Sequence, residues 1–152
     1  MESYDGTSWT EVNNVNTGRH RLAGLGTQTA ALATGGQNPD VTAINESWNG
    51  TSWTEVGDLN TARDMLGGAG ADNEAALGFG GLTPPSTRLD VVETWNGTSW
   101  TEVADLNQAR YQVAGSGASN TSALVLVEIN HLTLQQVKQN NGMEQLGQKL
   151  QI

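Results

Sequence analysis

Apolar and polar residues alternate along this chain in short segments of four to six residues, which is the period of a β-strand. The clearest alternation covers residues 90–95 and 98–103, with Asn96-Gly97 between them. Asn-Gly is a strong hairpin signal, because a type I′ turn needs a positive φ at both central positions. These residues predict two antiparallel strands joined by a tight turn.

Two further strands complete the pattern. A small, glycine-rich segment, 110–117, predicts a third strand after the break at 105–107. The fourth is clearest one repeat earlier, at 75–79, where it runs into Gly80-Gly81. The pattern therefore predicts units of four short strands.

The unit occurs three times. The copies begin at Glu2, Glu46 and Glu93, and each contains the residues GTSWTEV. The tryptophans in that motif are 44 and then 47 residues apart: Trp9, Trp53 and Trp100. A unit of this length with four short strands is typical of a β-propeller blade.

These residues resemble the kelch repeat, which galactose-oxidase-type propellers share. The resemblance covers roughly residues 2–125 and rests on a glycine pair, then Glu-x-aromatic, a turn, and a tryptophan. The matching residues are Gly35-Gly36 and Gly80-Gly81, then Tyr4, Trp48 and Trp95, then Trp9, Trp53 and Trp100. The motif GTSWTEV also resembles motifs in kelch-like arrays of marine metagenomic and phage proteins.

The resemblance implies an all-β fold of four-stranded kelch-like blades, with about three blades in residues 1–125. The six aromatic residues are expected to pack blade against blade rather than to stack on a sugar. Three blades are too few for a ring, since propellers use typically 4–8. The chain starts on the outer strands of one blade and stops on the inner strands of another. We therefore expect a partial ring, or half of a six-bladed homodimer.

Residues 126–152 depart from the repeat. An ordinary interpretation is a helix, because residues such as Leu134, Val137 and Leu146 have roughly helical spacing. Reading the back-translated codons from their third base instead allows WNGTTWTEVAD, nearly the motif at 95–105. The second interpretation, an out-of-frame fourth repeat, is preferred. It means that His131 is not considered a candidate site residue.

Composition narrows the classes of function. The net charge is −9 at pH 7, which argues against nucleic acid, because phosphate binding needs clustered Lys and Arg. No apolar run approaches the ~18 residues of a membrane span, and no signal peptide is visible, so the compartment stays unknown. Without cysteine there are neither disulfides nor thiolate metal sites.

Three arginines recur ahead of the glycine-rich strand: Arg19, Arg63 and Arg110. A ring of arginines could hold an anionic ligand at a channel mouth, since guanidinium groups bind carboxylates in bidentate fashion. The alternative is pairing with a repeated glutamate, from the set Glu2, Glu46 and Glu93 or the set Glu11, Glu55 and Glu102. Pairing is the favoured alternative, and the arginines remain the best ligand candidates.

Other candidate sites are weaker. Asn49 and Asn96 match the glycosylation pattern, but the turn explains them. Asp58 and Asp105 recur without the spaced oxygen ligands of a calcium site. With no cysteine and His20 as the only histidine outside the tail, neither copper chemistry nor a Ser-His-Asp triad is supported, and no cofactor is expected.

The sequence therefore predicts a non-catalytic binding or structural module that presents loops to a protein or glycan. One alternative is a glycan-active enzyme using loop carboxylates. It should carry an acidic pocket in a divergent loop, whereas the most divergent loop, 82–88, has no acid. Another alternative is a frameshifted fragment without function.

Overall fold

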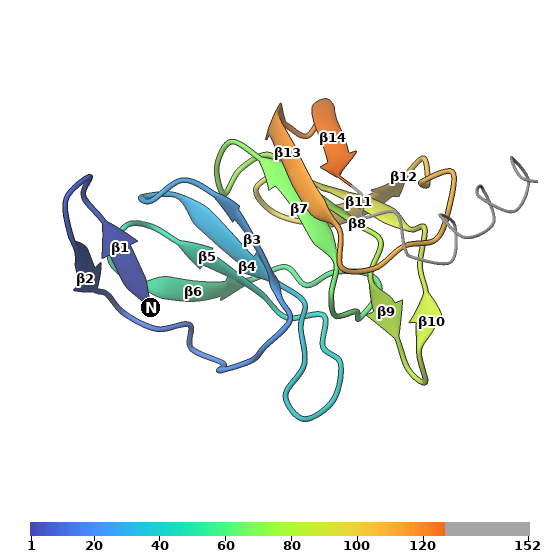
Figure 1. The fold of residues 1–152 in the computed structure, drawn as a ribbon, viewed down its shortest axis with the longest axis horizontal. Coiled ribbons are helices and arrows are strands. Elements are labelled where there is room, and N and C mark those ends of the chain that lie inside the picture. The colour runs from blue at the N-terminus through green and yellow to red at the C-terminus, as the bar shows by residue number, and fades with distance from the viewer. Residues whose placement is uncertain (127–152) are drawn as a thin grey trace, which may run out of the picture.

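Short antiparallel strands make up the computed structural model, which describes residues 1–126 and contains no helix in that range (Figure 1). One four-stranded sheet has the order β3 (Ala23–Gly26), β4 (Ala31–Thr34), β5 (Asn45–Trp48), β6 (Trp53–Val56). The second has the order β7 (Gly67–Gly70), β8 (Ala76–Phe79), β11 (Val92–Trp95), β12 (Trp100–Val103). The predicted all-β class is confirmed.

Three smaller sheets have two strands each. They are β1 (Glu2–Tyr4) with β2 (Trp9–Glu11), β9 (Leu82–Thr83) with β10 (Thr87–Arg88), and β13 (Ala114–Ser119) with β14 (Ser122–Leu126). Each four-stranded sheet takes its first two strands from one copy of the repeat and its last two from the next. The expected tail begins at Leu126, the last residue of β14; its remaining residues, with His131, lie outside the described residues.

The hairpin turns differ from the expected type I′ geometry. Trp95 pairs with Trp100, so four residues rather than two connect β11 to β12. Gly97 has a φ of 88°, whereas Asn96 does not have a positive φ. The Asn96 side chain instead accepts hydrogen bonds from the N–H groups of Thr98 and Ser99. An asparagine that holds a turn through its side chain needs no left-handed backbone.

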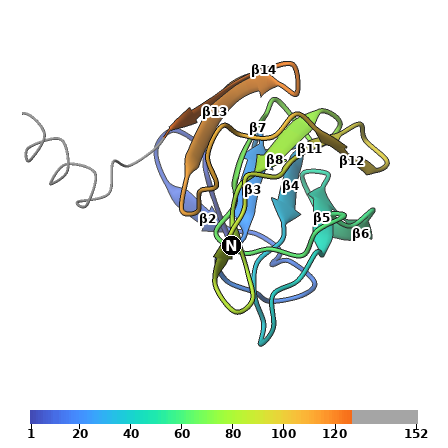
Figure 2. The same cartoon turned by 90° about the vertical axis from the view of Figure 1, so that its right-hand side faces the viewer.

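The strands β3, β7 and β13 lie side by side, as both views show (Figures 1 and 2). Between the two four-stranded sheets is one buried cluster, which includes Leu25 and Leu32 from the first sheet and Trp95 and Trp100 from the second. Aromatic side chains bury large areas, so Trp95 and Trp100 dominate the contact between the sheets. The relative exposure of Trp95 is 1%.

A series of backbone hydrogen bonds links successive repeats ahead of these strands. Met65 N–H donates to the carbonyl of Arg21, and Gln112 N–H donates to the carbonyl of Met65, both at 2.8 Å. All three residues have left-handed backbones, with φ between 51° and 60°. This conformation is uncommon without glycine, so the hydrogen bonds account for its recurrence at one repeat position.

The glycine pairs make a second link between repeats. Gly80 and Gly81 have φ values of 63° and 109°. Gly81 N–H donates to the carbonyl of Arg110 at 2.7 Å, and a Cβ on Gly80 would lie 2.6 Å from that same oxygen. Gly35 and Gly36 make the same approach to Arg63. Only glycine satisfies both the backbone conformation and the contact.

Gly80→Ala is therefore expected to lower the free energy of unfolding by about 1–3 kcal/mol, the range for a strained left-handed residue. Urea denaturation at fixed protein concentration measures this. Gly18→Ala is the control, because Gly18 has no positive φ and its Cβ would meet no atom within 4 Å. Equal effects of the two substitutions would contradict this account of the glycine pairs.

Candidate functional site

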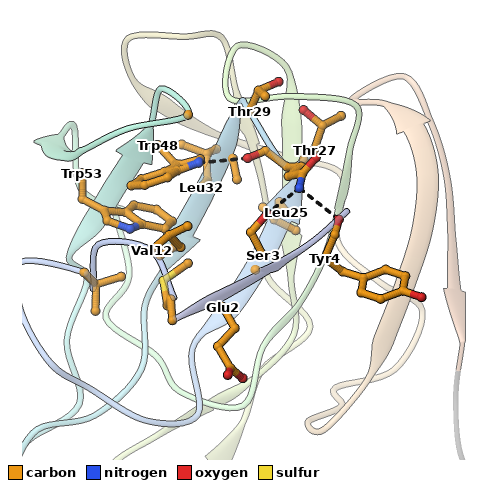
Figure 3. Close-up of a pocket in the computed structure, with 18 of the residues that line it drawn as sticks. Glu2, Ser3, Tyr4, Val12, Leu25, Thr27, Thr29, Leu32, Trp48 and Trp53 are labelled. Carbon is orange, nitrogen blue, oxygen red and sulfur yellow. Dashed lines mark hydrogen bonds between the residues drawn. The ribbon is translucent and has the colours of Figure 1, made fainter. Parts of the chain in front are cut away.

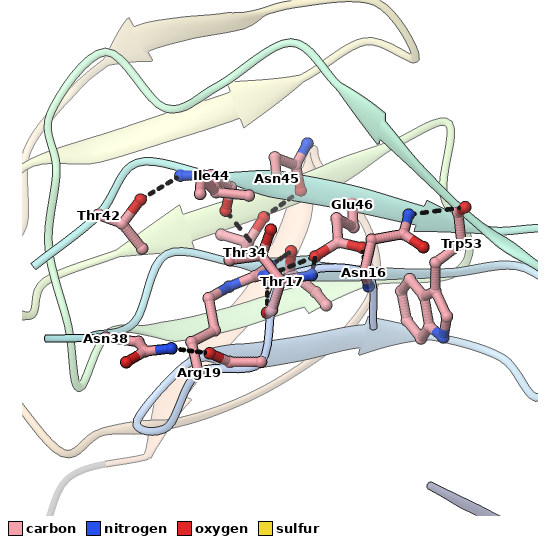
Figure 4. A network of polar contacts seen from close by, with 12 residues as sticks. Asn16, Thr17, Arg19, Thr34, Asn38, Thr42, Ile44, Asn45, Glu46 and Trp53 are labelled. Atoms are coloured by element: carbon pink, nitrogen blue, oxygen red, sulfur yellow. Dashed lines mark hydrogen bonds and ion pairs between the residues drawn. The ribbon is translucent and has the colours of Figure 1, made fainter. Parts of the chain in front are cut away.

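A buried carboxylate organises the segment that enters the first four-stranded sheet. Glu46 projects from β5, and its carboxylate accepts hydrogen bonds from the backbone N–H of Asn16 at 2.6 Å and of Thr17 at 3.2 Å (Figure 4). Arg19 donates to the same carboxylate in an ion pair whose side chains are both fully buried. The strand thereby fixes the conformation of the segment between β2 and β3.

The remaining donors of Arg19 bind the backbone. Nε donates to the carbonyl of Gly35 at 2.8 Å, and one terminal nitrogen donates to the carbonyl of Ala33 at 2.6 Å. The side chain therefore joins β4 and its glycine turn to the entering segment. A buried guanidinium needs this many acceptors, because removal of a charge from water is costly.

The second four-stranded sheet repeats the arrangement. Arg63 lies 3.1 Å from Glu93 of β11, and both side chains are fully buried. Backbone N–H of Asn60 donates to Glu93 at 2.8 Å, as Asn16 does to Glu46. The Nε of Arg63 is buried without an acceptor among the described residues, so this copy is bonded less completely.

The ion pairs shift the pKa of their members. Burial alone would raise the pKa of Glu46, but the hydrogen bonds from Arg19, Asn16 and Thr17 outweigh it, and the pKa lies below the ordinary value of 4.5. Burial lowers the pKa of Arg63, against the charges of Glu93 and Glu102. The carboxylate is therefore ionised at neutral pH, and its charge serves structure.

Of the three arginines predicted from the sequence, Arg19 and Arg63 lie in these ion pairs, away from any ligand at the surface. Arg110 is half-buried, and its side chain donates to Gln108 at 3.0 Å. It has no carboxylate partner within the described part of the chain. The structure thus does not bring the three arginines together around one site.

A different set of side chains gathers at the end of the sheets from which the β9–β10 hairpin projects (Figure 1). We call this surface the rim: Arg21, Gln37, Asp64, Arg88 and Tyr111, with the hairpin residues 82–88. A shallow cleft of about 200 Å³ lies there, lined by Arg21, Gln37, Asp64 and residues 82–86 among others. Arg21 donates to Asp64 at 3.2 Å, and the guanidinium of Arg88 lies 5.1 Å from the centre of the Tyr111 ring.

The rim contains the two exposed arginines of the described chain. Residues 1–126 contain five arginines, of which Arg19 and Arg63 are buried. Of the other three, Arg21 and Arg88 are exposed and belong to the rim, whereas Arg110 is half-buried. A protein with a net charge of −9 therefore has both of its exposed arginines in residues 1–126 on the rim.

Sequence analysis missed Arg21 and Arg88 as candidates. The repeat itself contained a signal. The three copies agree at the arginine and again at the apolar and glycine positions three to five residues later, but they differ at the two positions in between. Those differing positions hold His20-Arg21, Asp64-Met65 and Tyr111-Gln112. Arg88 belongs to the loop that carries the extra residues of the second repeat.

A second hollow lies on the first sheet. This groove has a volume of about 720 Å³ and lies between the β1–β2 hairpin and the sheet, with Leu25, Leu32, Trp48 and Trp53 in its lining (Figure 3). Trp48 Nε1 donates to the carbonyl of Gln28 at 2.9 Å. The groove is predominantly apolar, and the hairpin that covers one side of it adds Tyr4 and Trp9.

The six predicted packing residues separate into two groups. Each repeat pairs its two aromatic rings, with centroids 5.1–5.3 Å apart. The rings of Trp48, Trp53, Trp95 and Trp100 are buried. By contrast, Tyr4 is 48% exposed and Trp9 is 65% exposed.

The weaker candidates have ordinary structural surroundings. Asn49 and Asn96 hold their turns through hydrogen bonds from backbone N–H groups. Asp58 accepts a hydrogen bond from the backbone of Asn45 at 3.3 Å. No group of three or more His, Asp or Glu side chains that could hold a metal ion occurs in residues 1–126. The same residues contain no helix long and apolar enough to cross a membrane.

No protein-family model matches this chain, and no curated protein matches it. The resemblance to kelch repeats therefore rests on the residues quoted above.

The Glu46 network predicts a specific dependence of stability on pH. Because the pKa of Glu46 is lower in the folded chain than its ordinary value of 4.5, its stabilising contribution is complete above that pH. The contribution is lost as the pH falls through the folded-state pKa. Glu46→Gln should flatten this part of the pH profile in denaturation experiments. At pH 7 it should cost about 3–5 kcal/mol, because Arg19 is left buried without its partner.

Glu55→Gln is the matched control, since Glu55 is an exposed residue of the neighbouring strand β6. It should leave both the stability at pH 7 and the acid limb close to those of the natural chain. An unchanged acid limb in Glu46→Gln would contradict the role assigned to the carboxylate.

Proposed function

We propose that this chain is a non-catalytic binding module built from kelch-like propeller blades, with the rim as its recognition surface. The observation that carries the proposal is the contrast between positions within the repeat. Where residues hold the fold, as the arginine, glutamate and tryptophan do, the copies agree. Where residues face the rim, as Arg21 and Asp64 do, the copies differ.

This contrast is what a repeat scaffold with a binding surface requires. Fixed positions maintain each unit, while unlike side chains on one face give that face its specificity. Loops at the ends of strands provide such faces in many folds. The β9–β10 hairpin, which interrupts the regular repeat beside Arg21 and Asp64, fits this role.

The ligand class follows from charge and shape. Two exposed arginines, Arg21 and Arg88, favour carboxylate-bearing ligands, since guanidinium donors bind carboxylates with charge-assisted hydrogen bonds. Tyr111 adds an aromatic surface beside Arg88. We therefore propose an acidic glycan, or an acidic segment of a protein, as the ligand of the rim.

The proposal of a binding module is favoured over that of a glycan-active enzyme. Glycoside hydrolysis needs two carboxyl groups roughly 5–9.5 Å apart that flank the bond. The rim cleft is lined by a single carboxylate, that of Asp64, which Arg21 already binds.

The test is isothermal titration calorimetry, which measures the affinity of the full chain for an oligogalacturonate and for a polyglutamate peptide. Arg21→Gln and Arg88→Gln should each weaken binding by about tenfold, which corresponds to a charge-assisted hydrogen bond of ~1.4 kcal/mol. Binding should also weaken as salt increases.

Glu55→Gln changes the net charge by one unit in the opposite direction, on strand β6 outside the rim, so it should strengthen binding if overall charge alone decided the affinity and should leave the affinity unchanged if the rim is the site. Neutral dextran is the control ligand. Equal binding of dextran and oligogalacturonate, or insensitivity to both arginine substitutions, would argue against an acidic ligand at the rim. Release of shortened oligosaccharide during the titration would favour the enzyme.

A further inference from the structure

Two strands of the described structure, β1 and β14, lack the second neighbour that the strands at the corresponding positions of the complete sheets have. In the complete sheets, β4 pairs with β5 and β8 pairs with β11, so each of these strands has two neighbours. By position in the repeat, β14 corresponds to β4 and β8, and β1 corresponds to β5 and β11. Yet β14 pairs with β13 alone, and β1 pairs with β2 alone. Unpaired edges of this kind are templates for another strand.

The large apolar side chains at these edges are exposed, whereas their counterparts in the complete sheets are buried, fully or, for Leu77, in part. Leu124 is 67% exposed and corresponds to Leu32, which is 1% exposed. Leu126 is 52% exposed and corresponds to Phe79, which is 1% exposed. Tyr4 and Trp9, at the other edge, are the exposed counterparts of four buried tryptophans. At both edges, therefore, apolar side chains that a neighbouring strand buries in the complete sheets are left exposed.

The charges at the two edges are complementary. Arg110 corresponds to Arg19 and Arg63, each of which pairs with a glutamate on the third strand of its own sheet. The glutamate at the corresponding position for Arg110 is Glu2, on β1. Glu2 is exposed and forms no ion pair within the described chain. Each edge thus carries one half of the ion pair that the complete sheets contain.

The side chains that line the groove match the apolar side chains of the β14 edge. In the cluster between the complete sheets, Leu32 shares a buried environment with Trp95 and Trp100. The corresponding tryptophans, Trp48 and Trp53, line the groove beside β1 (Figure 3). A strand paired with β1 would carry Leu124 at the position that corresponds to Leu32. Its apolar side chain therefore matches the apolar lining.

From these observations we infer that two copies of this chain complete each other's open sheets. The β13–β14 hairpin of one copy fills the groove of its partner, and β14 pairs antiparallel with the partner's β1. The register of the complete sheets sets Leu124 opposite Ser3 of the partner subunit, as Leu32 is opposite Ser47 and Leu77 is opposite Thr94. Arg110 then pairs with Glu2 of the partner subunit.

Two-fold symmetry repeats the exchange at the other end, so both open edges of both copies are satisfied. Each copy supplies two complete sheets and half of each shared sheet. The assembly therefore contains six four-stranded sheets. The backbone series also continues, because Arg21 N–H and the carbonyl of Gln112 take no backbone partner within residues 1–126.

Cysteine pairing tests the exchange and its register, since the natural chain has no cysteine. Full-length Ser3→Cys and Leu124→Cys chains are mixed, refolded together and oxidised. Directly opposed residues of antiparallel strands have Cα atoms about 4.5–5.5 Å apart, which suits a disulfide. A covalent dimer should form, and random two-fold assembly sets its share at about half of the chains.

Ala123→Cys replaces Leu124→Cys in the matched control, because its Cβ faces the opposite side of the sheet from Ser3. This mixture should give little covalent dimer, and each single variant alone should give none. A cross-linked yield no higher than that of the control would overturn the proposal. So would a disulfide confined within one chain when both cysteines are placed in the same chain.

A second variant covers the case in which cysteine lowers the yield of folded protein. Leu124→Asp places a charge in the shared apolar contact and should reduce the mass in light scattering to that of one chain. Leu124→Ile, of the same volume, should keep the dimer. Retention of the dimer by Leu124→Asp would overturn the proposed contact.

Discussion

A guanidinium and a carboxylate, both withdrawn from solvent, tie the segment entering each complete sheet to the third strand of that sheet. Arg19 with Glu46 and Arg63 with Glu93 do this in the same way, and backbone N–H groups of the entering segment complete the hydrogen bonding of each carboxylate. A buried ion pair contributes less to stability than its Coulomb energy implies, because desolvation offsets much of the attraction. Its value here lies in specificity: an entering segment out of register would leave two charges buried without partners. The same arginines reach the carbonyls of the neighbouring strand, so a single contact sets the linker, the glycine turn and the sheet.

The division between fixed and varied positions follows from this constraint. A residue that must fill a buried contact in every repeat is the same in each copy, as the arginine, the glutamate and the second tryptophan are. The residue two positions after each arginine has a left-handed backbone and forms a hydrogen bond with the same position of a neighbouring repeat, and this geometry leaves its side chain free to differ. Arg21, Met65 and Gln112 accordingly share a conformation without sharing chemistry. The proposed recognition surface arises where the fold makes no demand on the side chain.

Much of the fold could be predicted from the sequence, because the strands, the glycine pairs and the repeat length are properties of local pattern. The strand β13 begins at Ala114, about four residues after its predicted start, because Arg110 and Gln112 belong to the segment that enters the sheet. The turn type was wrong because an asparagine side chain can hold a turn that its backbone conformation would not predict. The site was harder to predict: three identical arginines suggested a ring of ligands, and burial is a property of tertiary packing that the repeat pattern alone does not contain. The rim depends on contacts between separate repeats, of Arg21 with Asp64 and of Arg88 with Tyr111, which only the three-dimensional arrangement reveals.

Completion of the open sheets is the central claim, and the most direct measurement is the mass of the full-length natural chain in solution. Multi-angle light scattering on the purified protein, over a tenfold range of concentration, separates the alternatives. The account predicts a single species of twice the 16.0 kDa chain mass, in which Arg110 and Glu2 satisfy each other across the two copies. A monodisperse species of 16.0 kDa at every concentration would contradict it.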